Sequence, residues 1–496
     1  MLDSNTRSAG ILLHPTSLPS NTGIGEIGPH ARRFVTWLAD TGVKLWQVLP
    51  IVPPGSGHSP YSSWSAFAGS PLLISLEDLC SEGWLTQSEV DAIEVRSIDW
   101  VHYQVVKEQK MPLLERAATR FIEAGECESA PYITFTQRCA NWLTDAATFT
   151  ALDQSLEGPW WDWPTPLRTY KKSAVRKAVD QFQKEIRIFK VLQYFFDQQW
   201  SHLRRVCDEH GVQLIGDLPI YVDHHSADVW ANQSLFALDG SGKPSVVAGV
   251  PPDAFSDTGQ LWGNPIYDWT YSRETQHQWW VERLSRAFEL THSVRIDHFR
   301  AFSEYWEVPY GEADARTGSW VKGPGIDFFN VLREKLSDLP VIAEDLGMID
   351  QAVHDLVEAT GFPGMKVLQF AFGSGNNNLY LPHNHTLNSV VYTGTHDNDT
   401  TLGWWKDSSD YTKHHIRSYL GVDGHDIVWD IIRIALSSVA QWAIVPMQDL
   451  LTLSSETRMN RPSVAHGNWR WRVREEAFNH SIASRFKELI ELYNRG

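Results

Sequence analysis

Eight short apolar runs, separated by stretches with helical periodicity, constrain the fold of this sequence most strongly. Each run is almost continuously apolar and contains β-branched residues, which is typical of a parallel strand buried on both faces. The runs are residues 9–14, 44–50, 213–222, 293–299, 340–346, 366–372, 389–397 and 442–450. Helical patterns lie between many of them, for example at residues 29–41, 185–210, 327–336 and 350–360. Eight strands alternating with helices predict an α/β protein with the (β/α)8 barrel, or TIM barrel, fold.

The spacing of these runs is uneven, and two long gaps predict large insertions into the barrel. The gap between the second and third runs predicts a mostly helical insertion subdomain at residues 72–200. The gap between the third and fourth runs is rich in Gly, Pro, Asp and aromatic residues, and it predicts a second insertion subdomain at residues 223–291. Barrels grow readily by insertion between their strands. We therefore expect residues 1–496 to form a single catalytic barrel with two insertions.

The charge and composition of the chain exclude several classes of partner. Its 496 residues include 60 acidic and 43 basic side chains, a net charge of −17, which argues against nucleic acid and membrane surfaces as partners. There is no apolar run of about 18 residues and no signal-peptide pattern, so we expect a cytoplasmic protein. The four cysteines form no CxxC pair and indicate no disulfide framework. The 23 Trp residues fit either a large core or a site for sugars or aromatic ligands.

Charged residues cluster where the apolar runs end. They are Asp217 in the third run, Arg295, Asp297 and His298 in the fourth, Glu344 and Asp345 in the fifth, and His396, Asp397 and Asn398 in the seventh. Burying an unpaired charge is costly, so a buried strand that ends in a carboxylate needs a reason. Because the carboxyl ends of barrel strands meet at one rim, these side chains are predicted to converge.

Converging carboxylates without a metal-binding motif are typical of a retaining glycosidase. One carboxylate attacks the anomeric carbon, and a second with a raised pKa protonates the leaving oxygen and later deprotonates the acceptor. Arg295 and Asp297 lie two residues apart in one predicted strand and share a face, so the arginine would keep the aspartate ionised. A single strand-end carboxylate is more often a helix cap or an ion-pair partner. We assign that structural role to Asp345 and Asp350.

The order of three segments, VRIDHFR, IAEDLG and TGTHDNDT, resembles that of the 4-α-glucanotransferases, also called amylomaltases or disproportionating enzymes. These enzymes form glycoside hydrolase family 77 in the α-amylase clan of retaining barrels. Further segments are similar to the family: GILLHPTSLPSNTGIGEIGP, SPYSSWSAFAGSPLLI, GDLPIYV, VAGVPPDAFSDTGQLWGNPIYDW, PGMKVLQFAF and RMNRPSVAHGNWRWR. The similarity extends from Gly10 to about Arg472, nearly the whole chain.

The resemblance implies a role for each of three carboxylates. Asp297 would be the nucleophile that forms a covalent glycosyl intermediate, and Glu344 the general acid/base. Asp397 would bind two sugar hydroxyls and distort the donor ring toward the transition state. The implied activity is the transfer of α-1,4-glucan segments from one maltodextrin to the 4-hydroxyl of another, which releases glucose from short donors.

The resemblance also implies a set of residues that bind substrate. They are Ser59, Tyr61, Asp217, Phe255, Gln260, Trp262, Arg295 and His396. Arg295 and His396 would hold the nucleophile and the donor sugar, and a loop at residues 247–269 would cover the acceptor side. Phe255 and Trp262 in that loop are equally compatible with simple loop packing. Departures at Gly57–His58 and Ser463 put the outer sugar subsites in doubt but not the chemistry.

Other motifs do not support a cofactor or a metal. Gly23, Gly25 and Gly28 match GxGxxG, but no strand runs directly into the glycines, and the next apolar run ends without the acidic residue of a dinucleotide site. Adjacent histidines such as His224–His225 would face opposite ways on a strand, and neither HExxH nor an Asp-rich loop occurs. We therefore predict no cofactor and no metal.

Three functions stay open from the carboxylates alone: a glycosyltransferase, a hydrolase of the same clan and a non-catalytic glucan-binding protein. The family resemblance favours the transferase. A transferase must position a sugar acceptor and exclude water, and the loop at residues 247–269 is suited to that task. A binding protein would have lost a key carboxylate, and all three are present. The predicted partners are maltose, maltotriose and longer α-1,4-glucans, bound by a monomer or a homodimer.

Overall fold

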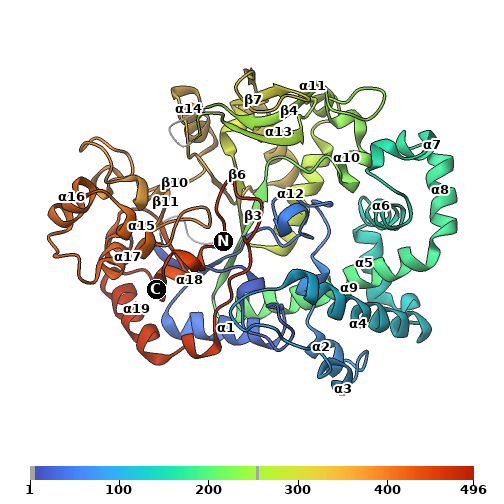
Figure 1. Ribbon diagram of the computed structural model, residues 1–496, viewed down its shortest axis with the longest axis horizontal. Coiled ribbons are helices and arrows are strands. Elements are labelled where there is room, and N and C mark those ends of the chain that lie inside the picture. Colours follow the sequence, from blue (N-terminus) through green and yellow to red (C-terminus); the bar gives the residue numbers. More distant parts are fainter. Residues whose placement is uncertain (1–5, 253–255) are drawn as a thin grey trace.

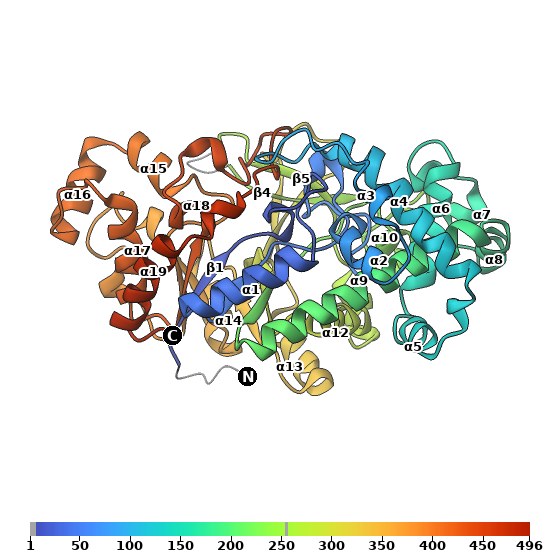
Figure 2. The ribbon, with the colours of Figure 1, turned by 90° about the horizontal axis from the view of Figure 1, so that it is seen from below.

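A closed barrel of eight parallel strands lies at the centre of the computed structural model, which describes residues 6–252 and 256–496 (Figures 1 and 2). Around the barrel the strands follow the order β1-β12-β11-β10-β9-β6-β3-β2. Their bounds are β1 (Ser8–Leu12), β2 (Leu45–Gln47), β3 (Gln213–Pro219), β6 (Ser293–Asp297), β9 (Val341–Ala343), β10 (Gly364–Val367), β11 (Ser389–Tyr392) and β12 (Trp442–Pro446). The predicted (β/α)8 fold is confirmed, because each of the eight apolar runs contains or overlaps one of these strands.

Most of the predicted strands are longer than the observed ones; the eighth run, expected as a strand over residues 442–450, ends as a strand at Pro446 and continues as a helix at Met447–Leu450. The sixth run was expected as a strand over residues 366–372, but β10 ends at Val367 and a 3-10 helix (Leu368–Phe370) follows. The seventh was expected to reach Asp397, but β11 ends at Tyr392. Beyond it, the backbone N–H and the hydroxyl of Thr395 both donate to Asn398 Oδ1, at 2.8 and 2.9 Å. These local bonds replace the strand ladder, so Asp397 lies in a loop beyond the strand.

Helices surround the barrel and follow most of its strands (Figure 2). Their bounds are α1 (Pro29–Thr41), α9 (Gln183–Glu209), α12 (Gln278–Leu290), α13 (Gly325–Leu336), α14 (Gln351–Thr360), α15 (Thr401–Asp407), α16 (Asp410–Leu420), α17 (Ile427–Ser437), α18 (Met447–Leu450) and α19 (His480–Leu492). In α1, Pro29 occupies the first turn, and Phe34, Val35 and Leu38 recur with helical spacing on the buried face. Gly42 then ends the helix at φ +82°, a left-handed conformation that suits glycine.

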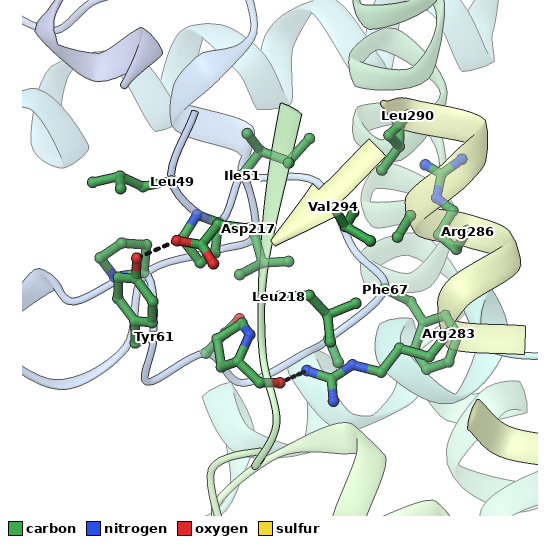
Figure 3. Close-up of a pocket in the computed structure, with 18 of the residues that line it drawn as sticks. Leu49, Ile51, Tyr61, Phe67, Asp217, Leu218, Arg283, Arg286, Leu290 and Val294 are labelled. Atoms are coloured by element: carbon green, nitrogen blue, oxygen red, sulfur yellow. Dashed lines mark hydrogen bonds between the residues drawn. The ribbon is translucent and has the colours of Figure 1, made fainter. Parts of the chain in front are cut away.

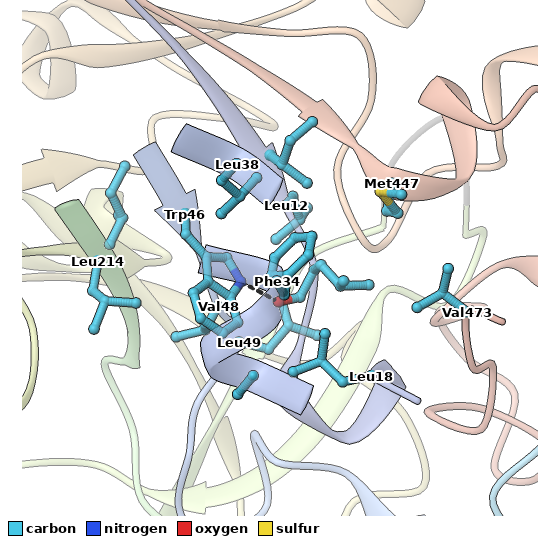
Figure 4. Packing of buried hydrophobic residues seen from close by; sticks show 14 of the residues in the cluster. Leu12, Leu18, Phe34, Leu38, Trp46, Val48, Leu49, Leu214, Met447 and Val473 are labelled. Atoms are coloured by element: carbon cyan, nitrogen blue, oxygen red, sulfur yellow. Dashed lines mark hydrogen bonds between the residues drawn. The ribbon is translucent and has the colours of Figure 1, made fainter. Parts of the chain in front are cut away.

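The core between α1 and the barrel is built around Trp46 of β2 (Figure 4). Its indole is fully buried and donates a hydrogen bond of 2.8 Å to the carbonyl oxygen of Leu13. The ring of Phe34 meets it edge-on, with the ring centres 5.0 Å apart. A buried indole with its N–H satisfied combines a large apolar contact with a fixed orientation. This packing fixes α1 against the strands that carry the rim loops.

The chain between β2 and β3 is mostly helical and forms the right-hand part of the molecule in Figure 1. Before α9, which leads back to β3, come α2 (Leu76–Ser81), α3 (Gln87–Val90), α4 (Tyr103–Glu123), α5 (Ala130–Arg138), α6 (Leu143–Ser155), α7 (Thr165–Arg168) and α8 (Lys172–Gln181). The predicted large insertion at this place in the barrel is therefore present. A single buried cluster joins side chains of this region, such as Leu114 and Phe121, to barrel residues such as Leu45.

A second sheet of four antiparallel strands, in the order β5-β4-β7-β8, lies at the upper edge of Figure 1. Its strands are β4 (Val246–Val250), β5 (Gln260–Pro265), β7 (Glu304–Pro309) and β8 (Ser319–Lys322). The first two, with α10 (Ala227–Ala231) and α11 (Trp269–Glu274), lie between barrel strands β3 and β6, as the second predicted insertion requires. The sequence pattern did not predict β7 and β8, which follow β6. They are short and half-exposed, so they lack the continuous apolar run of a buried strand.

A buried ion pair attaches the helical insertion to the barrel. Lys110 Nζ of α4 lies 2.5 Å from Glu26 Oε1, which belongs to the loop after β1, and donates to the carbonyl oxygen of Leu72 at 2.7 Å. The side chains of Lys110 and Glu26 are 1% and 9% exposed. Because both charges are desolvated, removing one partner leaves the other uncompensated.

Lys110→Met should therefore lower the free energy of unfolding by about 3–5 kcal/mol. Denaturant unfolding followed by circular dichroism measures this change. In the double variant E26Q/K110M no buried charge is left, and most of the loss should be recovered. The matched control is Arg116→Ala on the same helix, whose solvent-screened ion pair with Glu89 should contribute little to stability. Equal losses for Lys110→Met and Arg116→Ala would contradict this account.

Candidate active site

The site is built on neighbouring strands of the barrel. Asp217 of β3 and Arg295 of β6 are direct partners in the register of the sheet, and Asp297 is the last residue of β6. Arg295 Nη1 lies 2.7 and 2.8 Å from the two carboxylate oxygens of Asp217, and Nη2 lies 2.6 Å from Asp297 Oδ1. One guanidinium thus joins two carboxylates. Burial lowers the pKa of Arg295, but the charges of Asp217 and Asp297 outweigh it and raise that pKa well above its ordinary value.

Tyr61 covers Asp217 from the loop after β2. Its hydroxyl donates a hydrogen bond of 2.6 Å to Asp217 Oδ2 (Figure 3). Its ring stacks on the imidazole of His396, with centres 5.1 Å apart and planes inclined by 12°. Behind Asp217, a cavity of about 70 Å³ lies against α12 and is lined mostly by apolar side chains such as Leu49 and Val294. Asp217 is therefore enclosed, and burial raises the pKa of its carboxyl group.

Glu344 stands beside this group, directly after β9. Its Oε2 accepts a hydrogen bond of 2.7 Å from the backbone N–H of His298, a residue held at φ +56° between Asp297 and the following 3-10 helix. Burial, and next the charge of Asp297, raise the pKa of Glu344 well above its ordinary value. No ion pair of Glu344 occurs within residues 6–252 and 256–496. The two carboxylates differ in environment, since Asp297 is paired with a cation and Glu344 is not.

Asp397 reaches the site from the loop after β11. Its Oδ1 accepts a hydrogen bond of 2.6 Å from Asn460 Nδ2 and lies 3.4 Å from His396 Nε2. Its side chain is 44% exposed, more than the 29% of Asp297. Asn460 was missed by the sequence analysis. The only signal was its place in the RMNRPSV segment, which resembled the family but suggested no role for this residue.

Several of these residues line an open cleft of about 560 Å³, but Glu344, Asp217 and Arg295 are not among its lining residues. The predicted site residues that line it are Ser59, Tyr61, Gln260, Trp262, Asp297, His396 and Asp397. Asp217 and Arg295 lie behind this wall with buried side chains. Phe255 lies outside the described residues. The structure thus brings the described members of the predicted set together at the carboxyl ends of the strands.

Trp262 lies in the hairpin of β4 and β5, which makes up much of the expected loop at residues 247–269. Its indole N–H donates to Gln260 Oε1 at 3.1 Å, and its ring meets the imidazole of His298 edge-on with centres 4.7 Å apart. The side chain is 37% exposed and lines the cleft, so it is not confined to packing within the hairpin. An exposed ring with a fixed orientation suits the apolar face of a sugar.

Of the two carboxylates that were predicted to cap a helix or form an ion pair, Asp350 does so, and Asp345 instead binds the backbone of a neighbouring strand. Asp350 caps α14, where its side chain accepts a hydrogen bond of 3.1 Å from the backbone N–H of Val353. Asp345 accepts one of 2.6 Å from the backbone N–H of Met365. Among the residues that the structure describes, no group of three His, Cys, Asp or Glu side chains is arranged to hold a metal ion. None of the described helices is long and apolar enough to cross a membrane.

A (β/α)8 barrel that brings paired carboxylates and aromatic rings to one open cleft at its strand ends has the features of a carbohydrate-active enzyme. The sequence profile of the family described as 4-alpha-glucanotransferase matches residues 13–477, and the chain belongs to this family. Its activity is therefore that of a transferase of glycosyl groups.

Individual relatives agree with this placement. The chloroplastic/amyloplastic 4-alpha-glucanotransferase of Arabidopsis thaliana is 45% identical over 497 residues, which cover 99% of this chain and 86% of the relative. The 4-alpha-glucanotransferase of Thermus thermophilus is 43% identical and is covered over 99% of both chains. Among solved structures, the amylomaltase from Streptococcus agalactiae in complex with acarbose superimposes with a TM-score of 0.96, at 38% identity and 99% coverage of this chain and 100% of that one.

Arg295→Met should reduce the stability of the protein in a pH-dependent way. Without the cation, the buried Asp217 has its pKa raised further and binds a proton that the unfolded chain has already lost. The loss of stability should therefore grow as pH rises from about 5 toward the raised pKa, and reach about 3–5 kcal/mol. Thermal unfolding between pH 5 and 8 measures it. The double variant D217N/R295M lacks the carboxylate and should lose this pH dependence; a dependence that persists would rule out Asp217 as its source.

Proposed function

We propose that Asp297, Glu344 and Asp397 carry out retaining transfer of α-1,4-glucan segments between maltodextrins. The observation that carries the proposal is the contrast between the first two carboxylates. Asp297 Oδ1 lies 2.6 Å from Arg295 Nη2, so this carboxylate has a cation beside it. Glu344 has a pKa raised by burial and by the charge of Asp297, which favours its protonated form. A carboxylate paired with a cation is suited to act as the nucleophile, and a carboxyl group with a raised pKa is suited to act as the acid.

In the first step an oxygen of Asp297 forms a bond to the anomeric carbon of the donor sugar. The bond from that carbon to the glycosidic oxygen breaks, its electron pair goes to the oxygen, and the proton of Glu344 neutralises it. The shortened glucan leaves, and the transferred segment stays on Asp297 as an ester. Neutral Glu344 then becomes a carboxylate close to Arg295.

In the second step Glu344 acts as the base. It takes the proton from the 4-hydroxyl of an acceptor glucan while the hydroxyl oxygen attacks the anomeric carbon and the bond to Asp297 breaks. Two inversions at the same carbon retain the α configuration. Asp397 and His396 face the donor ring, and hydrogen bonds from Asp397 to sugar hydroxyls would hold the distorted ring of the transition state. Tyr61 and Ser59 line the same side of the cleft.

The acceptor side is assigned to the hairpin of β4 and β5. Gln260 and Trp262 project from β5 into the cleft next to His298. An acceptor sugar placed on Trp262 would displace water from the space in front of the ester, because aromatic rings bind the apolar face of glucose. Water at about 55 M competes with the acceptor, so this exclusion determines the ratio of transfer to hydrolysis.

The remaining sequence-based assignments belong to the same proposal. Residues 1–496 act as a single catalytic barrel, with subdomains at residues 72–200 and 223–291, since one buried cluster joins helical insertion and barrel. The partners are maltose, maltotriose and longer α-1,4-glucans. The monomeric or dimeric state and the cytoplasmic location stay predictions.

Incubation of the purified protein with maltotriose alone tests the activity. Transfer produces glucose and a ladder of longer maltodextrins while the number of reducing ends stays constant, which thin-layer chromatography and a reducing-sugar assay measure together. Asp297→Asn should lower the rate at least about 10³-fold with unchanged folding. Rising reducing ends with only shorter products would indicate a hydrolase. Wild-type turnover in Asp297→Asn would show that the nucleophile is assigned wrongly.

Glu344→Gln should separate the two steps. With α-maltotriosyl fluoride as donor, fluoride leaves without a proton, so the first step should proceed while the second lacks its base. The glycosyl ester on Asp297 should then accumulate and be visible by mass spectrometry of the intact protein. Azide, which attacks without losing a proton, should restore turnover. In the wild type, the rate on maltotriose should fall as pH rises through the raised pKa of Glu344. A Glu344→Gln enzyme that transfers from maltotriose at the wild-type rate would contradict the assignment.

A further inference from the structure

Arg458 lies behind Asp397 and takes no part in lining the cleft. It belongs to the segment that follows α18, after the eighth strand of the barrel. Its Nη2 donates to the backbone carbonyl oxygen of Asp397 at 2.9 Å, and its Nε donates to the carbonyl oxygen of Asn460 at 3.2 Å. One rigid guanidinium therefore holds the backbone of both residues, whose side chains meet in the cleft.

Further hydrogen bonds join the loop of Asp397 to the segment of Asn460. Asn460 Nδ2 donates to Asp397 Oδ1 at 2.6 Å, and the backbone N–H of Asn460 donates to the carbonyl oxygen of His396 at 3.1 Å. The two loops are thus joined through backbone and side chain at the position of the third carboxylate. Asn460 can donate these two hydrogen bonds only if its backbone is correctly placed. Arg458 holds that backbone through the carbonyl oxygen of Asn460.

The charge of Arg458 has a partner away from the cleft. Its Nη1 lies 3.8 Å from Asp399 Oδ2, and the same oxygen accepts a hydrogen bond of 2.9 Å from Ser455 Oγ. The side chain of Arg458 is 20% exposed. Its fork of donors therefore points to two carbonyl oxygens and one carboxylate, an arrangement that lysine with a single ammonium group does not reproduce.

Asp397 needs such support because its own strand does not provide it. β11 ends at Tyr392, and the contact from the Asp397 backbone N–H within its own loop is a long one, 3.3 Å to Thr395 Oγ1. Asp297, in contrast, belongs to β6 and pairs with Pro219 of β3 in the barrel. A catalytic group on a loop stays in place only if neighbouring segments hold it.

We infer that Arg458 is a positioning residue of the transfer reaction, which aims the carboxylate of Asp397 by fixing its backbone to that of Asn460. The inference rests on the proposed role of Asp397 in distorting the donor ring. Because Asp397 is proposed to hold the distorted donor ring, loss of Arg458 should affect the transition state more than the binding of the ground state. A displacement of the Asp397 carboxylate by about 1 Å costs up to about 100-fold in rate.

The test is a double-mutant cycle between Arg458 and Asp397, with kcat and KM measured on maltotriose and a fluorescent maltodextrin as acceptor. Arg458→Ala should lower kcat about 10- to 100-fold while KM changes less than about twofold. Arg458→Lys, which can reach one carbonyl oxygen but not both, should give an intermediate kcat. In the Asp397→Asn background, Arg458→Ala should change the residual rate less than about twofold, because the group that it positions is already gone.

Arg461→Ala is the matched control. Arg461 lies in the same segment and is exposed, and within the described residues its side chain makes one hydrogen bond, of 3.5 Å to the carbonyl oxygen of Ser455, so its removal should leave kcat unchanged. Thermal unfolding of each variant shows that the fold is retained. The inference is overturned if Arg458→Ala keeps the wild-type kcat, or loses the same factor in both backgrounds. A wild-type protein that makes no ladder from maltotriose, or an Asp397→Asn variant with full activity, would overturn the proposed function and this inference with it.

Discussion

The guanidinium of Arg295 is the interaction on which the rest of the site depends. It lies between Asp217 and Asp297, and removing it would leave two carboxylates close together without a cation. The side chain of Asp217 is fully buried. Within the described residues, its side-chain hydrogen-bond partners are Arg295 and Tyr61. The pairing satisfies the buried Asp217 and at the same time places a cation beside Asp297. Glu344 forms no ion pair in the described part of the chain, and burial and the charge of Asp297 raise its pKa.

The three carboxylates are held with different rigidity by the barrel. Asp297 is the last residue of β6, and Glu344 is the first residue after β9, so the strand ladder places both. Their relative position is tied further by the hydrogen bond from the backbone of His298 to Glu344. Asp397 lies five residues past its strand and takes its position from Asn460 and Arg458 instead. The carboxylates proposed as nucleophile and acid/base thus stand at strand ends, and the one proposed to bind the donor ring stands on a loop that other segments hold.

The barrel and the rim carboxylates were predictable because both produce local patterns in the sequence. A strand buried on both faces needs a continuous apolar run, and a carboxylate at its end stands out against that run. The spacing of Arg295 and Asp297 predicted their contact, which the structure has at 2.6 Å. What the pattern did not contain was the end of β11 at Tyr392, because the turn that ends it depends on the side chain of Asn398.

Long-range partners were the least predictable part. Asn460 meets Asp397 across 63 positions of sequence, and neither residue carries a local sign of the other. The sheet of β5, β4, β7 and β8 pairs half-exposed strands from two different loops, so no continuous apolar run in the sequence predicted it. Hydrogen bonds between distant polar residues follow from the fold as a whole and become visible only once the strands are in place.

That four-stranded sheet has a mechanical consequence. β4 pairs with β7 from Val246 and Pro309 to Gly249 and Trp306, and β7 follows β6 after one short helix. The hairpin that carries Trp262 and the strand that follows Asp297 therefore belong to one hydrogen-bonded sheet. If the hairpin binds the acceptor as proposed, a shift of the hairpin would reach the end of β6 through these backbone hydrogen bonds, whatever side chains the hairpin carries.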